Sequence, residues 1–397
     1  MKRFHLQAAT HPCTENAMNM NLLRRWFVGN EWESVDEPAQ ADVIIVATCG
    51  FSQEQEDYEI ELIDRLGKEK KDDCQLIVLG CLPRINKERL DSVFNGATVK
   101  TDSVAKFDDL LKLDKKTRDF HNHLVSHAEY ATDRKMSMYF RIRRFFERLE
   151  WLPFIKVPRV FYTVPSEKWW CVRCAMGCTG DCSFCGTKHA EFPFKSEPQR
   201  QIIEQIKEGL DAGYKEIALT GEDLGGYGCD IGTDLSELLK EIVGLPGDFV
   251  VNIRFLDPVW LIKLMDKLMP IFETGKIKAF CTPAQSGSNR VLELMNRPYT
   301  FEQIKETINT IMRKSGVKMI STNIIVGFPS ETPEEVDLSK RLLNEVDFGM
   351  YQIYKYEEHP YTKAAKLPGK ISPEETQRRF KKLYRLALRK NARNLFR

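Results

Sequence analysis

The sequence predicts an α/β protein in which an N-terminal parallel-sheet α/β domain is followed by a partial (β/α)6 TIM-like barrel. Two patterns predict this class. Short β-branched apolar runs alternate with helical stretches in the first third of the chain, and six further strand–helix pairs follow from residue 169. Such runs between helices are typical of buried parallel strands. A chain of 397 residues is long enough for two cores.

The chain divides into four predicted parts. They are an N-terminal domain, a linker with a basic amphipathic helix, the barrel domain and a basic C-terminal helix, at residues 1–115, 116–165, 166–370 and 371–397.

In the N-terminal domain three apolar runs each lead to a cysteine. The expected strands span residues 4–10, 43–48 and 76–80, with helices at 16–27 and 53–66, and the cysteines are Cys13, Cys49 and Cys81. Parallel strands gather their carboxyl ends at one edge of the sheet, where ligands bind. We therefore expect the three cysteines to share a metal site, whereas Cys74, which precedes its strand, reads as an ordinary core cysteine.

The barrel domain is predicted from its alternating elements. The expected strands are Trp169–Cys174, Lys215–Thr220, Phe249–Phe255, Ile277–Thr282, Val317–Val326 and Gly349–Tyr356. Between them lie helical stretches that include Gln199–Leu210, Trp260–Met269, Phe301–Lys314 and Pro333–Asn344. In such barrels the functional residues lie at the carboxyl ends of the strands.

A loop after the first barrel strand carries Cys178, Cys182 and Cys185 with C-x3-C-x2-C spacing. A 4Fe–4S cube usually has four cysteine ligands, so three local thiolates would leave one iron open to a small molecule. A structural zinc site is the alternative, because Cys171 and Cys174 stand close enough in sequence to complete a four-ligand set.

Polar and glycine residues follow the later barrel strands. A carboxylate there can hold an ammonium group, an arginine can hold a carboxylate, and a glycine permits close approach of a ligand. The candidate binding residues are Gly221, Glu222, Arg254, Gln285, Ser286 and Asn323, together with Phe184 in the cysteine loop.

Composition excludes some classes of protein. The formal net charge of +2 gives no overall bias toward nucleic acid or acidic membranes. The sequence contains no apolar run long enough to span a membrane and no signal-peptide core at its start. Eleven cysteines without a signal favour a reducing compartment and metal ligation over disulfides, so we expect a cytoplasmic protein that does not contact a membrane.

These motifs together resemble the methylthiotransferase family of radical S-adenosylmethionine (SAM) enzymes over nearly the whole chain. The three-cysteine loop, Gln-Ser-Gly-Ser-Asn at 285–289 and Ile-Val-Gly-Phe-Pro at 325–329 match the family pattern. Residues 185–190 and 219–233 are most similar to the archaeal and eukaryotic branch, which modifies threonylcarbamoyladenosine in tRNA. The chain departs from the family pattern at Pro12, Ala47, Cys281 and Asn323, none of which is an expected cluster ligand.

The resemblance implies two 4Fe–4S clusters, SAM and an electron donor such as flavodoxin or ferredoxin. The cluster at Cys178, Cys182 and Cys185 would cleave one SAM to a 5′-deoxyadenosyl radical that abstracts a hydrogen atom from an unactivated carbon. An auxiliary cluster at Cys13, Cys49 and Cys81 would carry the sulfur that another SAM methylates. Glu222 is then expected to bind the amino group of SAM, and Arg254 its carboxylate.

The expected substrate class depends on the C-terminal part of the sequence. The family normally carries a C-terminal TRAM barrel that contacts the substrate, and the sequence stops at Arg397 with no room for one. We therefore expect a ribosomally made peptide or a protein side chain as the substrate, with threonylcarbamoyladenosine in tRNA as the alternative. Specific tRNA binding would depend on two basic helical stretches, residues 134–152 and 381–397, although such helices are more often solvated faces docked on their own domain.

Two further interpretations compete with this one. A cobalamin-dependent radical SAM methylase would also place an α/β domain first, but the Asp-x-His that begins at Asp119 has Leu124 where a glycine is needed and no suitable helix follows, so we discount it. A cluster- or zinc-bearing RNA-binding protein without catalysis is the non-enzymatic alternative. No role is predicted for Cys229 or Cys281, and none for Cys171 or Cys174 outside a zinc site.

Overall fold

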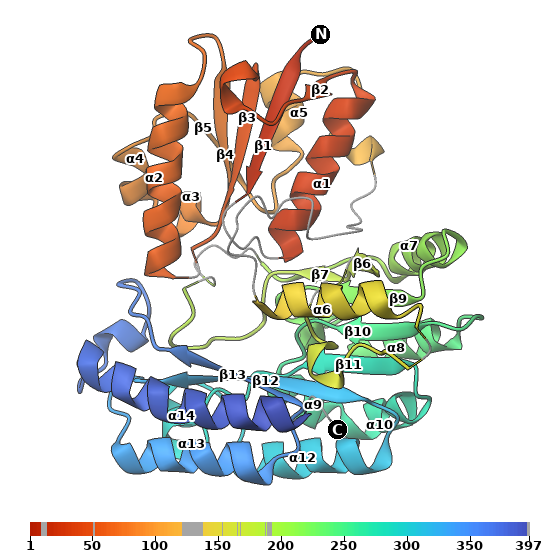
Figure 1. The fold of residues 1–397 in the computed structure, drawn as a ribbon, viewed down its shortest axis with the longest axis vertical. Helices are drawn as coiled ribbons and strands as arrows, with labels where there is room; N and C mark the ends of the chain where they lie inside the picture. The colour runs from red at the N-terminus through yellow and green to blue at the C-terminus, as the bar shows by residue number, and fades with distance from the viewer. Residues whose placement is uncertain are drawn as a thin grey trace. The chain divides into compact units, whose positions relative to one another are not determined.

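The computed structural model describes residues 1–8, 14–50, 52–120, 138–152, 154–164, 166, 168–186, 188 and 193–394. Contacts divide the chain into two compact units, each with its own parallel sheet (Figure 1). Unit 1 comprises Met1–Met138 and Gly186–Phe192, and unit 2 comprises Tyr139–Cys185 and Pro193–Arg397. The predicted α/β class, with an N-terminal parallel sheet and a second parallel-sheet domain, is confirmed. The predicted boundaries at residues 115, 165 and 370 stay a prediction.

The sheet of unit 1 has the strand order β2-β1-β3-β4-β5, and all its pairings are parallel. Its strands are β1 (Arg3–Ala8), β2 (Glu33–Ser34), β3 (Val43–Thr48), β4 (Gln75–Gly80) and β5 (Ala97–Lys100). Its helices are α1 (Thr14–Gly29), α2 (Gln53–Glu69), α3 (Leu82–Ile85), α4 (Lys87–Asp91) and α5 (Lys106–Leu111). The edge strands β2 and β5 were not predicted, because each is short and lacks a continuous apolar run.

The strand order of unit 1 also explains where its helices lie. The chain moves outward from β1 to β2 and then in the opposite direction from β3 to β4. Right-handed crossovers therefore place α1 and α2 on opposite faces of the sheet, as Figure 1 shows. The point where the direction reverses lies between β1 and β3, which is where ligands bind in open α/β sheets.

Unit 2 contains an open six-stranded parallel sheet with the order β6-β9-β10-β11-β12-β13. Its strands are β6 (Trp169–Arg173), β9 (Glu216–Thr220), β10 (Val250–Ile253), β11 (Ile277–Cys281), β12 (Met319–Val326) and β13 (Met350–Lys355). A separate antiparallel pair is formed by β7 (Ala175–Met176) and β8 (Lys195–Ser196). The six predicted barrel strands are present, each within two residues of its expected bounds.

Helices pack around this sheet. They are α6 (Met138–Leu149), α7 (Gln199–Asp211), α8 (Leu235–Gly244), α9 (Pro258–Lys263), α10 (Met265–Glu273), α11 (Asn289–Leu294), α12 (Phe301–Lys314), α13 (Pro333–Glu345) and α14 (Pro373–Asn394). Short 3₁₀ turns are η1 (Pro38–Gln40), η2 (Thr117–Asp119), η4 (Arg159–Phe161), η6 (Leu224–Gly226) and η7 (Ala364–Lys366). The single helix predicted at 260–269 is two helices, α9 and α10, that meet at Leu264.

Helix α6 contacts the first residue of β9 through one buried arginine. Arg143 is 1% exposed, pairs with Glu147 at 2.7 Å and approaches Glu216 of β9 at 3.5 Å. Its guanidinium also donates to the carbonyl oxygens of Phe161 and Val164. A buried guanidinium needs such partners, so this arginine has a structural role and is not available to bind a phosphate.

Candidate active site at the carboxyl ends of the barrel strands

The three-cysteine loop follows β7. Cys178, Cys182 and Cys185 are all half-buried. A Cβ added to Gly180 would lie 3.3 Å from the Sγ of Cys178 and 3.8 Å from the Sγ of Cys182, so both sulfurs lie close to this glycine. Three cysteines within eight residues, two of them with sulfurs near the same glycine, fit a cubic cluster with one open iron.

Backbone hydrogen bonds fix this loop to the end of α11 and to η7. The Ser183 amide donates to the carbonyl oxygen of Met295 at 3.0 Å, and its hydroxyl donates to that of Leu294 at 2.7 Å. The Ala364 amide donates in turn to the Ser183 carbonyl at 2.8 Å. Ser183, which directly follows Cys182, is therefore held by hydrogen bonds to both α11 and η7.

A buried arginine approaches one of the cysteines. Nη1 of Arg297, which is 6% exposed, lies 3.0 Å from the Sγ of Cys182. Its Nε donates to the hydroxyl of Tyr299 at 2.7 Å, and its Nη2 pairs with Asp257 at 2.5 Å. The guanidinium therefore places a fixed positive charge beside one of the three predicted cluster ligands. Arg297 was not predicted, because nothing in the local sequence pattern distinguishes a buried arginine from an exposed one.

The loop is also bound to the segment after β9. Both the amide and the hydroxyl of Thr179 donate to the carboxylate of Asp223, and the Trp260 indole donates to the same oxygen at 3.3 Å. Burial raises the pKa of Asp223 above its ordinary value. These contacts connect the cysteine loop to the end of β9, beside the predicted Glu222.

Glu222 and Gly221 lie at the carboxyl end of β9. Oε2 of Glu222 accepts a hydrogen bond from the Gly177 amide at 3.1 Å, directly before the first cysteine of the loop. Gly221 lies against the Ala175 carbonyl oxygen, which a Cβ at this position would approach to 3.0 Å. The carboxylate is thus placed beside the cysteine loop, as the resemblance implies for a group that binds the amino end of SAM.

Gln285 and Asn323 are joined at the ends of β11 and β12. The Gln285 amide donates to the Asn323 carbonyl at 2.9 Å, and the Ile325 amide donates to the Gln285 carbonyl at 2.9 Å. Among the described residues, Oε1 of Gln285 and Oδ1 of Asn323 are buried without a hydrogen-bond partner. Buried polar atoms are normally paired, so two such oxygens at the functional edge fit a site for a polar ligand. Ser286, the residue after Gln285, is fully buried.

Arg254 and Phe184 have other contacts. Arg254 donates through Nη1 to the Thr163 carbonyl at 2.6 Å and lies over the Trp169 ring at 5.4 Å. Burial lowers the pKa of Arg254. Phe184 packs against the apolar cluster that includes Phe328 and Met295. The expected contact of Arg254 with the SAM carboxylate, and that of Phe184 with SAM, stay predictions.

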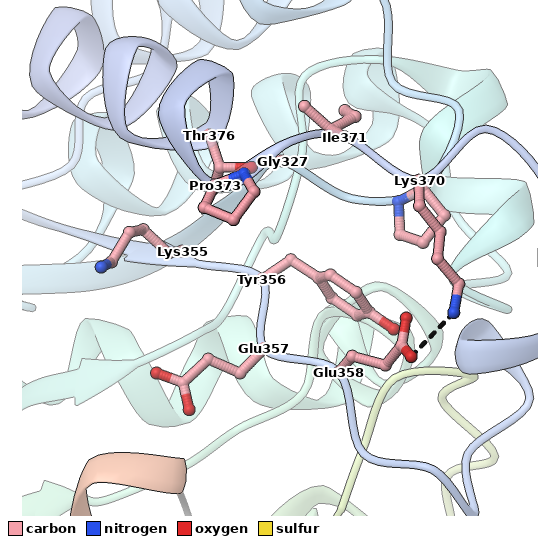
Figure 2. Close-up of a pocket in the computed structure, with 10 residues that line it drawn as sticks. Gly327, Lys355, Tyr356, Glu357, Glu358, Lys370, Ile371, Pro373 and Thr376 are labelled. Atoms are coloured by element: carbon pink, nitrogen blue, oxygen red, sulfur yellow. Dashed lines mark hydrogen bonds and ion pairs between the residues drawn. The ribbon is translucent and has the colours of Figure 1, made fainter.

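A pocket of about 260 Å³ opens at the carboxyl ends of β12 and β13 (Figure 2). Gly327 and Tyr356 line it from the strand ends, and Thr376 lines it from the first turn of α14. Lys370 pairs with Glu358 at 2.8 Å at its rim. Of the residues predicted to bind SAM, none lines this pocket in the described part of the chain. It does place the start of α14 at the functional edge of the sheet.

In unit 1 two of the three predicted cysteines lie at the expected edge. Cys49 follows β3 and is buried, and Cys81 follows β4 and is half-buried. The Cys81 amide donates to the Thr48 carbonyl at 3.2 Å, which places the two cysteines at adjacent strand ends. Cys13 lies outside the described residues, so the three-cysteine set stays a prediction.

A buried glutamate adjoins this edge and was also missed. Oε1 of Glu59, on α2, accepts the Cys49 amide hydrogen at 2.7 Å, and the residue is fully buried. Burial raises the pKa of Glu59 well above its ordinary value. A glutamate at the apolar position of an otherwise amphipathic helix was the available signal, because charged residues are rarely fully buried.

The remaining cysteines have no shared site in the described residues. Cys171, Cys174 and Cys281 are buried, and Cys229 is exposed. Across the described ranges, no group of three or more His, Cys, Asp or Glu side chains is already arranged around one point as a metal ion would require. Within the same ranges, no helix is long and apolar enough to cross a membrane.

Comparison with known proteins connects these features. The Radical SAM superfamily model matches residues 172–343, and the model described as uncharacterized protein family UPF0004 matches residues 5–100. A probable threonylcarbamoyladenosine tRNA methylthiotransferase of Archaeoglobus fulgidus is 31% identical over 393 residues, which are 97% of this chain and 84% of that protein. The chain belongs to the radical SAM methylthiotransferase family. It is a radical SAM methylthiotransferase.

Other relatives of this methylthiotransferase carry two kinds of name. The threonylcarbamoyladenosine tRNA methylthiotransferase MtaB of Aquifex aeolicus is 28% identical over 90% of this chain and 82% of its own length. The ribosomal protein uS12 methylthiotransferase RimO of Clostridium novyi is 26% identical over 96% of this chain and 80% of its own. A structure of the radical SAM methyltransferase TsrM from Kitasatospora setae has a TM-score of 0.60 at 14% identity, covering 92% of this chain and 75% of that one. That likeness concerns the fold alone.

We expect Glu222→Ala to weaken SAM binding to the reconstituted methylthiotransferase by about ten- to a hundredfold. A charge-assisted hydrogen bond contributes roughly 1.5–3 kcal/mol, which corresponds to that range. Anaerobic calorimetry would measure the affinity. Glu222→Gln is the matched control, because it keeps an acceptor for the Gly177 amide but removes the charge, so it separates binding of an ammonium from positioning of the loop. Unchanged SAM affinity in folded Glu222→Ala protein would remove Glu222 from the site.

Proposed function

We propose that this methylthiotransferase inserts a methylthio group into threonylcarbamoyladenosine of tRNA, using two 4Fe–4S clusters and SAM. The observation that carries the proposal is the extent of the likeness to a probable threonylcarbamoyladenosine tRNA methylthiotransferase, at 31% identity through 97% of the chain. It covers the unit that contains Cys49 and Cys81 as well as the loop that contains Cys178, Cys182 and Cys185. A loop whose adjacent sulfurs and buried arginine suit a cluster supports the same chemistry.

The prediction of a peptide or protein substrate is wrong. The first six relatives found are all named for tRNA, from A. fulgidus at 31% identity to Methanothermobacter thermautotrophicus at 29%. One of the grounds for that expectation was the net charge of the whole chain, which describes its surface poorly. Helix α14 carries eight basic and two acidic residues, a net charge of +6, while the whole chain has +2. An average near zero therefore conceals a strongly basic surface.

In the proposed reaction, the residues of unit 2 bind one cluster and SAM. When bound, the clusters and SAM supply the electron transfer, the radical and the methylated sulfur. In this proposal Cys178, Cys182 and Cys185 hold one cluster, and Arg297 keeps a positive charge beside it. Glu222 binds the ammonium group of SAM, while Arg254 and Phe184 contact other parts of it. The buried oxygens of Gln285 and Asn323 accept hydrogen bonds from its polar groups, with Ser286 and Gly221 shaping the cavity.

In unit 1 we assign Cys13, Cys49 and Cys81 to the auxiliary cluster. Cys49 and Cys81 are at adjacent strand ends, and Cys13 follows β1 in sequence, across the point where the strand order reverses. Ligands of open α/β sheets gather at this point. An external one-electron donor such as flavodoxin or ferredoxin completes the proposal, because reductive cleavage of SAM would consume one electron that the chain itself does not supply.

The decisive test is the modified nucleoside. We expect anaerobically reconstituted protein, supplied with SAM and a reductant, to convert threonylcarbamoyladenosine in tRNA to its methylthio derivative, detected by mass spectrometry of the digested RNA. The same tRNA without the threonylcarbamoyl group is the control substrate. A product on a uS12-derived peptide, with none on tRNA, would overturn the proposal.

A further inference from the structure

The longest helix of unit 2, α14, has one face buried on the sheet and one face exposed. Buried Asn391 donates to the Tyr351 carbonyl of β13 at 3.0 Å and accepts its amide hydrogen at 2.9 Å. Arg379 donates to the carbonyl oxygen and, at 3.1 Å, to the carboxylate of buried Glu331 after β12. Figure 1 shows α14 alongside β13 and α13. These contacts fix the orientation of the helix and therefore of its outer face.

The outer face carries a basic stripe, which we define as Lys381, Arg385, Arg389 and Arg393. All four residues are exposed. They recur every four positions, so they lie on successive turns along one side of the helix. Within the described residues none of the four has a hydrogen-bond or ion-pair partner. Their neighbours on the same helix do, since Arg378 pairs with Glu375 and Lys382 with Asp337.

The basic stripe does not stabilise the helix, so helix stability does not explain why these four positions are basic. A solvated helix usually gains from acidic residues placed four positions from its basic ones, whereas the stripe contains three consecutive i,i+4 pairs of like charge, which weaken a helix. Interaction with the helix dipole favours cations only in the last turn, where Arg393 lies. The other three cations gain little from it. A bound polyanion would offset the repulsion between these cations, because it attracts each of them.

The chemistry of the face fits nucleic acid better than an acidic peptide. Tyr384 is 38% exposed, flanks the stripe beside Lys381 and stacks on Phe380 with ring centroids 5.1 Å apart. An exposed aromatic ring beside a row of cations can stack on a base while the cations bind phosphates. The stripe rises about 6 Å for every four residues, a spacing comparable to that of successive phosphates along one strand.

The stripe is also continuous with the functional edge of the sheet. Thr376, five residues before Lys381, lines the pocket at the carboxyl ends of β12 and β13. A strand of RNA that follows the stripe toward its first residue is therefore led toward the edge where Glu222, Gln285 and Asn323 lie. We propose that the basic stripe of α14 docks the phosphate backbone of the tRNA substrate. This inference rests on the proposed function.

The experiment measures tRNA binding to the full-length protein from about 50 to 200 mM salt. Four phosphate contacts give a loss of affinity of roughly 50- to 150-fold across this range. The variant K381Q/R385Q/R389Q/R393Q should bind at least tenfold more weakly at 50 mM, and the slope of log affinity against log salt should decrease by about three. Circular dichroism and thermal melting would show that the variant is folded.

The matched control removes the same charge elsewhere. Lys68, Lys87, Arg200 and Arg341 are exposed helical cations that pair with an acidic residue four positions away. Their combined glutamine variant should keep the wild-type slope. An unchanged slope in the stripe variant, or equal loss in both variants, would overturn the docking surface while leaving the modified nucleoside to decide the proposed function. An acidic peptide that binds the wild type but not the stripe variant, while both proteins bind tRNA equally, would assign the stripe to another partner and overturn the docking surface as well.

Discussion

Replacing Cys178, Cys182 and Cys185 together with alanine is expected to abolish the formation of 5′-deoxyadenosine from SAM. Without these three thiolates the loop offers no ligands for the cluster that is proposed to bind SAM. The loop should otherwise keep its place, because Ser183 is held through its own backbone and hydroxyl by Met295, Leu294 and Ala364. Anaerobic incubation with SAM and dithionite, followed by chromatography of the nucleosides, measures the effect.

The second cysteine set supplies the contrasting variant. Replacing Cys13, Cys49 and Cys81 should leave cleavage of SAM largely intact and abolish transfer of the methylthio group to tRNA. Fully reconstituted wild-type protein should contain about eight irons, and each triple variant about four. About four irons in the wild type would contradict two cubes, and loss of 5′-deoxyadenosine in both triple variants would contradict separate roles.

Arg297→Leu is expected to lower the reduction potential of the cluster at the cysteine loop and to reduce cleavage of SAM by more than tenfold. Reduction adds negative charge to the cluster, and the buried guanidinium 3.0 Å from the Sγ of Cys182 stabilises that charge. A charge-assisted hydrogen bond of roughly 1.5–3 kcal/mol corresponds to at most about 60–130 mV for one electron. A redox titration monitored by electron paramagnetic resonance measures the reduction potential directly, independently of turnover.

Two variants separate this effect from general loss of charge. Lys363→Gln removes an exposed cation that pairs with Asp181 of the same loop at 2.6 Å, and solvent screening should leave the potential nearly unchanged. Arg297→Lys keeps the charge but not the fork that contacts Cys182, Tyr299 and Asp257 together, so it should restore only part of the potential. An unaltered potential in iron-replete Arg297→Leu protein would show that the contact is purely structural.

The sequence was sufficient for the fold class and for most of the elements. Runs such as Val43–Thr48 and Phe301–Lys314 have the predicted bounds, because a buried parallel strand and an amphipathic helix each impose a period that local sequence records. Short edge strands such as Glu33–Ser34 were missed for the converse reason. Two exposed residues carry no period, and only pairing with β1 makes them a strand.

The candidate site divides in the same way. The spacing of the cysteines and the order of the strands can both be read from the sequence. The sequence by itself therefore determined the class of enzyme, the cysteine loop and the edge of the sheet at which ligands gather. The burial of a side chain and its hydrogen-bond or ion-pair partners are decided only when segments distant in the sequence pack together. The tertiary structure alone decided that Arg297 reaches Cys182 across 115 positions, that Arg143 is buried under the barrel, and that Lys381, Arg385, Arg389 and Arg393 are exposed without a partner among the described residues. The sequence shows the charge of an arginine, but the free energy of that charge depends on its solvent and its neighbours, which the fold supplies.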